Sequence, residues 1–265
     1  MGMKTMMVLA AILCGNQDEA VKTFHEALKG ASEEERIEAA REALGTVHEK
    51  VIKTVGKLIH TDTEKVRVDV ARAIGKVDHP SSVDVLVKAL SRHRKTPGVL
   101  GAIARGLGDL GWERAAPSLN KLLSDVGNED IRSGLTDVVV ALAQIGSESS
   151  VEPLINFLNT LKGKLPKLNP KKRLGSSWQE AELLTKYAMA ALASITGGSG
   201  KNVPEWRTYW SRNRKELLAS ATSTWWNRKT MDRTVTSRGE KKPSNSLLVG
   251  KRLTAPPPAS MTEGR

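Results

Sequence analysis

The chain of 265 residues carries 41 Lys and Arg against 29 Asp and Glu, a formal net charge of +12. It has a single cysteine, Cys14, which excludes an intrachain disulfide, and no apolar stretch is long enough for an ordinary transmembrane helix. Residues 162–177 contain six Lys or Arg and no acid, and residues 227–265 contain nine against three acids. These two basic segments account for the whole net charge, so the remainder of the chain is neutral.

The first fifteen residues resemble a short bacterial export signal. Lys4 is followed by an apolar run at residues 5–13, and polar sequence starts at Asn16. A positive residue before a short apolar run is typical of a signal peptide. We therefore expect residues 1–15 to direct export to the periplasm or beyond. The alternative is a cytoplasmic protein whose first residues pack as half a helix on the fold or form an uncleaved anchor.

Amphipathic helices are predicted from residue 17 onward. Residues 17–29 and residues 51–59 each place apolar side chains on one helix face. Two capping boxes, in which a hydroxyl and a glutamate three residues later satisfy free backbone N–H groups, are expected to mark helix starts: Ser32 with Glu35, and Thr61 with Glu64.

Residues 66–160 contain an internal repeat that predicts the fold. Each of three aligned segments is an Ala- and Gly-rich helix followed by a short polar break and a Leu-rich helix. The equivalent leucines Leu86, Leu119 and Leu154 lie 33 and 35 residues apart. A period in this range is typical of a solenoid of helix pairs, and no run of strand-like alternation is sustained. The predicted fold is therefore an all-α, right-handed α-solenoid of about five helix pairs over residues 16–218.

The C-terminal part is predicted to contain one interrupted repeat and a tail. Residues 162–177, with two prolines, read as a basic loop inserted in a helix pair. A long helix should follow from Ser177, with its partner at residues 204–218. Residues 219–265 are basic and proline-containing, which is typical of a largely disordered tail.

These helix ends and turns resemble HEAT repeats of the bacterial type related to phycobilisome-lyase HEAT-like repeats. The resemblance is carried by the Ala-Arg-Gly-Leu-Gly-Asp-Leu-Gly ending at residues 104–111 and by Val-Glu-Pro-Leu at residues 151–154. The Leu-Ala-Ser-Ile-Thr-Gly-Gly segment at 192–198, with Trp206 and Trp210 after it, resembles the Trp-rich C-terminal cap of exported members. The resemblance implies an armadillo-type fold that serves protein–protein contact.

We therefore predict a non-catalytic scaffold that binds a protein partner and needs no cofactor. The second helices of the repeats should line one face and present polar residues that lie off the apolar stripe. An exposed Trp pair in the tail, beside Arg228 and Lys229, is a further candidate contact. The predicted partner-binding residues are Asp84, Lys88, Ser118, Lys121, Glu152, Asn156, Trp225 and Trp226.

Two other functions stay open at the level of sequence. The first is binding of nucleic acid or another polyanion through the tail and the basic loop, since clustered Lys and Arg neutralise phosphates. The loop residues are Lys162, Lys164, Lys167, Lys171, Lys172 and Arg173. The second is a metal-dependent enzyme, because His25-Glu26 and His48-Glu49 superficially resemble the His-Glu motifs of deoxyhypusine hydroxylase. A di-iron site needs several such ligands converging from different helices, so we expect no metal site here.

Overall fold

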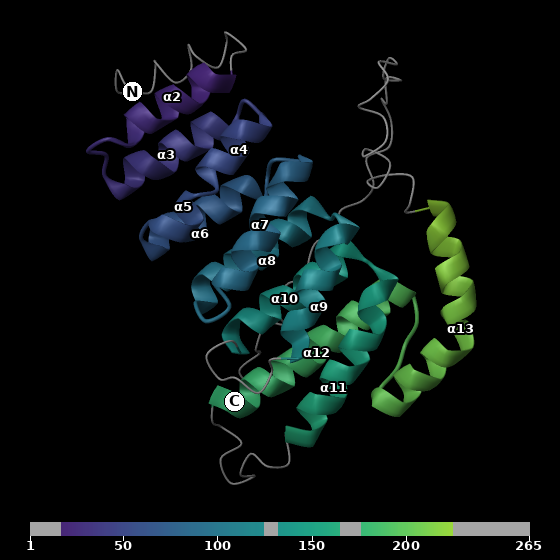
Figure 1. Ribbon diagram of the computed structural model, residues 1–265. Coiled ribbons are helices and arrows are strands. Elements are labelled where there is room, and N and C mark those ends of the chain that lie inside the picture. Colours follow the sequence, from purple (N-terminus) through teal and green to yellow (C-terminus); the bar gives the residue numbers. More distant parts are fainter. Residues whose placement is uncertain (1–16, 125–131, 165–175, 225–265) are drawn as a thin grey trace, which may run out of the picture. The chain divides into compact units, whose positions relative to one another are not determined.

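The computed structural model describes residues 17–124, 132–164 and 176–224, and every regular element in these segments is helical (Figure 1). Two single 3₁₀ turns, η1 (Glu113–Ala115) and η4 (Glu148–Ser150), precede α9 and α11. The α-helices are α2 (Gln17–Leu28), α3 (Glu33–Leu44), α4 (Glu49–Val55), α5 (Leu58–Thr61), α6 (Glu64–Ile74), α7 (Pro80–Arg92), α8 (Pro97–Leu110), α9 (Ala116–Leu123), α10 (Arg132–Ile145), α11 (Val151–Lys164), α12 (Ser176–Thr196) and α13 (Val203–Thr224).

The helices form two layers. In the first layer α3, α6, α8, α10 and α12 pack in succession, each against the next. In the second layer α2 packs on α4, α4 on α7, α9 on α11 and α11 on α13. Contacts between consecutive helices, such as α7 with α8 and α11 with α12, join the layers. This is the arrangement of an α-solenoid, as the repeat period predicts.

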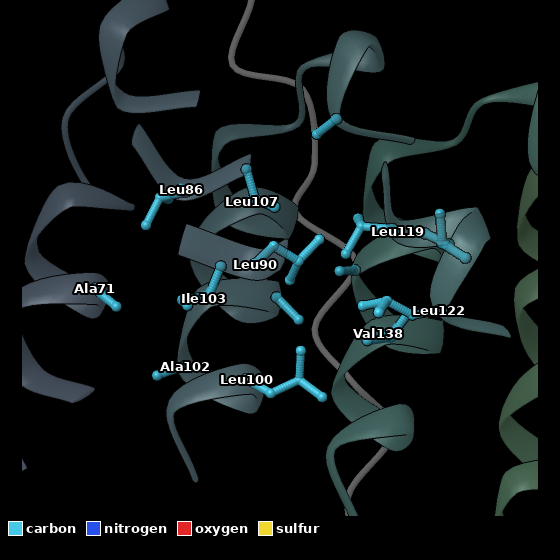
Figure 2. Packing of buried hydrophobic residues seen from close by; sticks show 14 of the residues in the cluster. Ala71, Leu86, Leu90, Leu100, Ala102, Ile103, Leu107, Leu119, Leu122 and Val138 are labelled. Carbon is cyan, nitrogen blue, oxygen red and sulfur yellow. The ribbon is translucent and has the colours of Figure 1, made fainter. Parts of the chain in front are cut away.

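The core lies between the two layers and is aliphatic. The three equivalent leucines of the repeat, Leu86, Leu119 and Leu154, are fully buried. Figure 2 shows Leu86 of α7 close to Leu107 of α8, and Leu122 of α9 close to Val138 of α10. Burying a leucine stabilises the fold by roughly 1.5–3 kcal/mol. Because each helix pair shares this surface with its neighbours, the pairs are stable as a stack rather than singly.

Close approach of the first-layer helices depends on glycine. A Cβ atom placed on Gly75, at the end of α6, would overlap the backbone of Gly106 in α8. A Cβ on Gly106 would lie only 3.1 Å from the carbonyl oxygen of Ala71. The Gly residues of the repeat therefore allow two helix backbones to touch where a side chain would separate them.

Of the two predicted capping boxes, one is confirmed and the other is wrong. Ser32 and Glu35 form the expected capping box. Pro97 begins α8 as a first-turn proline, and Thr96 is its N-cap. Thr61 does not cap α6: it is the last residue of α5, and Thr63 is the N-cap of α6.

Residues 51–59 are not one helix. The chain leaves α4 at Gly56 and starts α5 at Leu58. The C-terminal end of the solenoid also differs, because α13 continues to Thr224, past the predicted end at residue 218. The apolar stripe in the sequence marks only the buried part of a helix. It is the same whether the helix continues with polar residues, as α13 does, or breaks for two residues, as between α4 and α5.

Polar contacts between repeats lie at the turns. Trp112 Nε1 donates a hydrogen bond to Asp78 Oδ1 at 2.8 Å, and Ser147 Oγ donates to Glu113 Oε1 at 3.0 Å. Each pair is 34 residues apart in sequence, one repeat. Equivalent turns of consecutive repeats are therefore bonded directly to each other, which fixes the stacking of the pairs.

Candidate interaction surface

The second layer presents most of the predicted partner-binding residues to solvent. Lys88 on α7, Lys121 on α9 and Asn156 on α11 are exposed, whereas Ser118 is half-buried. Asp84 is exposed and forms an ion pair with Arg114 at 3.2 Å. These side chains come from successive helices of one layer, as the prediction required.

Glu152 is tied to α13 instead of being free for a partner. Its Oε1 lies 3.1 Å from Arg214 Nη1 and accepts a long hydrogen bond of 3.4 Å from Trp210 Nε1. The guanidinium of Arg214 also lies 5.9 Å from the centre of the Trp210 ring. The sequence pattern showed that Glu152 lies off the apolar stripe of α11. Only the packing of α13 shows that Arg214 and Trp210 contact it.

A groove of about 520 Å³ runs between α11 and α13. Its floor is apolar, from Ile155 and Trp210, and its walls are polar. Arg207 at its edge is exposed and forms no ion pair with another residue of the described segments. The groove is open at the surface and contains no acid other than Glu152, so it suits a polar peptide segment more than an apolar small molecule. The polar wall residues are Glu152, Asn156, Arg207, Ser211 and Arg214.

A second groove, of about 610 Å³, lies between α3 and α6 in the first layer. Arg41 of α3 reaches Asp69 across it, at 3.7 Å, and Arg72 lies equally far from Asp69 on the same helix, α6. At its edge Val47 adopts a left-handed backbone with φ of 53° and is 48% exposed. A β-branched residue in this conformation is strained, and nothing in the sequence pattern of the α3–α4 turn indicates it.

The two layers differ in charge. The second-layer helices, α2 included, contain twelve Lys or Arg against eight Asp or Glu, whereas the first-layer helices from α3 to α12 contain eight against eleven. Lys162 and Lys164, at the end of α11, belong to the basic segment predicted at residues 162–177. Only the assignment of each helix to a layer shows that the second layer is the basic side of the described fold.

Two histidines that the sequence analysis did not use stack between α5 and α7. His60 Nδ1 lies 3.3 Å from His93 Nε2, and the rings are 5.4 Å apart at an angle of 10°. His93, the C-cap of α7, is 7% exposed, and His60 is half-buried. They are 33 residues apart, one repeat period, and that spacing is the signal in the sequence that could have revealed them.

The surroundings of this pair disfavour protonation. The pKa of His60 is lowered by burial and then by the nearby charges of Arg92, His93, Lys88 and Arg67. The pKa of His93 is lowered by burial and by Arg67, while a hydrogen bond with the backbone of Ile59 acts in the opposite direction. Burial and the neighbouring cations therefore act in the same direction, against the imidazolium form of each ring.

The basic loop predicted at residues 162–177 is shorter than expected. Lys162 and Lys164 belong to the last turn of α11, and α12 already begins at Ser176. The other residues predicted to bind polyanions, Lys167, Lys171, Lys172 and Arg173, lie outside the described segments. So do Trp225, Trp226 and the predicted export signal, which stay predictions.

The tryptophans of α13 serve packing. Trp206 is 1% exposed and Trp210 is 7% exposed. Tyr209 packs edge-on against Trp206, with ring centres 5.9 Å apart, and its hydroxyl donates to the carbonyl oxygen of Thr196. These side chains hold α13 against α11 and the end of α12, and Trp210 also lines the groove between α11 and α13.

The two His-Glu motifs considered for a metal site lie on different helices. His25 is exposed on α2, and His48 is the N-cap residue of α4. Within the described segments no three His, Cys, Asp or Glu side chains gather as metal ligands. None of the helices in these segments combines the length and the hydrophobicity of a membrane span.

Comparison with known proteins agrees with the helix-pair architecture. A family model of HEAT repeats matches residues 21–95 and 52–138, and a model of the PBS lyase HEAT-like repeat matches residues 136–160. No curated protein matches the sequence significantly. A similar solved structure is that of an engineered protein from the Northeast Structural Genomics Consortium. It is 21% identical, with 74% of this chain and 85% of that chain covered and a TM-score of 0.42.

Proposed function

Because the chain is a HEAT-repeat protein, we propose that it is a non-catalytic scaffold that binds another protein through its second layer. HEAT repeats generally serve protein–protein contact, since stacked helix pairs form an extended continuous surface. The observation that carries the proposal is the alignment of exposed polar side chains on successive second-layer helices, from Lys88 on α7 to Asn156 on α11.

The geometry favours a protein as the bound molecule. The groove between α11 and α13 is open, with an apolar floor and a polar rim, which is unlike the enclosed apolar pockets that bind small molecules. The exposed side chains are mixed in charge, with Asp84 between the cations of α4 and α7. Mixed charges suit the rim of a protein interface, which is polar, while a few central residues provide most of the binding energy.

The test is affinity capture with the tagged full chain from its native cells. It is then repeated with variants in which the charge of exposed side chains is changed. We expect Lys121→Glu with Asn156→Glu to abolish capture of a specific protein, because both side chains are exposed on the second layer. Asp109→Lys is the control: it is equally exposed but lies on α8 of the first layer. Equal capture by all three proteins, or loss only with Asp109→Lys, would exclude the second layer as the binding surface.

A further inference from the structure

A group of five basic side chains gathers where α5, α6 and α7 meet, and we call it the cationic cluster. Lys88 and Arg92 lie one turn apart on α7 and are exposed. His60 of α5 and His93 after α7 are the stacked pair beside them. Arg67 reaches the pair from α6, since its charge acts on both imidazoles.

The positive charge of this cluster is only partly balanced from within the described part of the protein. Asp62 is the acid closest in sequence to His60, and both of its oxygens accept hydrogen bonds from Arg36, at 2.9 and 2.8 Å. The charge of Arg67 also lowers the pKa of Asp62, so this one carboxylate is shared by two guanidinium groups. Neither Lys88 nor Arg92 forms an ion pair with any described residue. Arg67 Nε is buried without a hydrogen-bond partner. Like charges held together with too few counter-charges favour an anionic ligand.

We propose that the cationic cluster binds a carboxylate-rich segment of the partner protein, and that this binding tightens as the pH falls through the range in which histidine titrates. The proposal rests on the proposed function and names the chemistry of the partner. Carboxylates fit better than a nucleic-acid backbone, because Asp84 on the same helix and Glu49 on α4 would repel a continuous row of phosphates. A peptide can place its acidic residues between them.

The pH dependence follows from charge coupling between ligand and histidines. In the free protein, burial and the neighbouring cations disfavour the imidazolium forms of His60 and His93. Bound carboxylates bring negative charge close to the pair, which favours those forms and raises both pKa values. Binding then takes up protons, so a lower pH strengthens it. The glutamates of the ligand stay ionised at pH 5.5, because their ordinary pKa is about 4.3.

The experiment measures anisotropy of a fluorescein-labelled glutamate-rich peptide with the folded full chain, at constant ionic strength between pH 7.5 and 5.5. We expect Lys88→Glu with Arg92→Glu to weaken binding about tenfold or more, since each reversal replaces an attraction to the peptide carboxylates by a repulsion. The matched control, Lys76→Glu with Lys186→Glu, changes the net charge equally but lies at the end of α6 and on α12. Its affinity should stay within about twofold of the wild type.

The histidine variant tests the proton linkage separately. His60→Gln with His93→Gln should bind the peptide at pH 7.5 like the wild type, and should lose the strengthening at pH 5.5. The proposal is overturned if the peptide does not bind, or if both charge variants weaken its binding equally. It is also overturned if the histidine variant keeps the pH dependence of the wild type. So would tighter binding of a single-stranded oligonucleotide that needs Lys88 and Arg92. The scaffold function can stand although this inference fails. That is the result if the wild-type chain still captures a cellular partner and the variant Lys121→Glu with Asn156→Glu does not.

Discussion

At the scale of single residues, the same two histidines connect stability with pH. His60 and His93 occupy equivalent places in consecutive repeats and stack across the boundary between them. This environment favours their neutral forms, because both rings are at least half-buried and the positive charges of Arg67 and Arg92 are near them. The unfolded chain imposes no such restriction, so its imidazoles titrate near their ordinary pKa of about 6.5.

This difference predicts acid sensitivity. Since the folded-state pKa of both histidines lies below the unfolded value, the unfolded chain binds more protons than the native protein as pH falls below about 6.5. The free energy of unfolding should therefore decrease from pH 7.5 to 5.5, as measured by urea denaturation. In His60→Gln with His93→Gln this decrease should be smaller. His25→Gln, at an exposed position of α2, should keep the wild-type slope, and equal slopes in all three would contradict the explanation.

At the scale of helices, contact between backbones sets the spacing of the first layer. Gly75 ends α6 with an ordinary right-handed backbone, φ of −61°, so conformational freedom is not the reason for glycine there. The reason is space, because Gly106 of α8 lies against it. Interiors of proteins are packed as densely as organic crystals, so no gap remains into which a methyl group could move.

Gly75→Ala should lower the free energy of unfolding by about 1–3 kcal/mol, because overpacking costs that much and exceeds the gain from replacing glycine at a helix end. The matched control is Gly163→Ala in the last turn of α11, where an added Cβ would meet no atom within 4 Å. There the substitution should be neutral or stabilise by up to about 1 kcal/mol. Chemical denaturation of the two variants measures both effects, and destabilisation of equal size would show that space at Gly75 is irrelevant.

At the scale of the whole described fold, each helix pair packs mainly on the pairs before and after it. Among the described helices, the main contacts of the succession α3, α6, α8, α10 and α12 are between neighbours, and no substantial contact returns from α12 to α3. Stability in such a stack is the sum of repeat and neighbour terms. A defect at one end should therefore remain local.

Trp206→Ala tests this expectation. Trp206 is almost fully buried, and truncation of a buried tryptophan costs about 3–5 kcal/mol. Hydrogen exchange followed by mass spectrometry should show lost protection in α13 and the adjoining part of α12, with α3 to α8 unchanged. Trp112→Phe, at the turn between α8 and η1, removes the hydrogen bond to Asp78 far from α13 and should leave α13 protected. Uniform loss of protection over all helices would show that the stack unfolds as one cooperative unit.

The sequence by itself determined the class of fold, because helical periodicity and repeat length are local properties. Leu86, Leu119 and Leu154 are buried as their spacing predicts, and Ser32 caps α3 with side chains only three residues apart. The exposed candidates Lys88, Lys121 and Asn156 followed from the same periodicity. A position off the apolar stripe faces either solvent or another element, and mostly it faces solvent.

Only the tertiary structure decided what covers the exposed positions and which charges come together. Glu152 is held by α13, which lies 58 residues further along the chain at Trp210. His60 and His93 meet because consecutive repeats stack, and the basic side of the molecule emerges only when each helix is assigned to a layer. The physical reason is that burial and electrostatic neighbourhood depend on distances in space, whereas a pattern along the chain determines only which face of each helix turns inward.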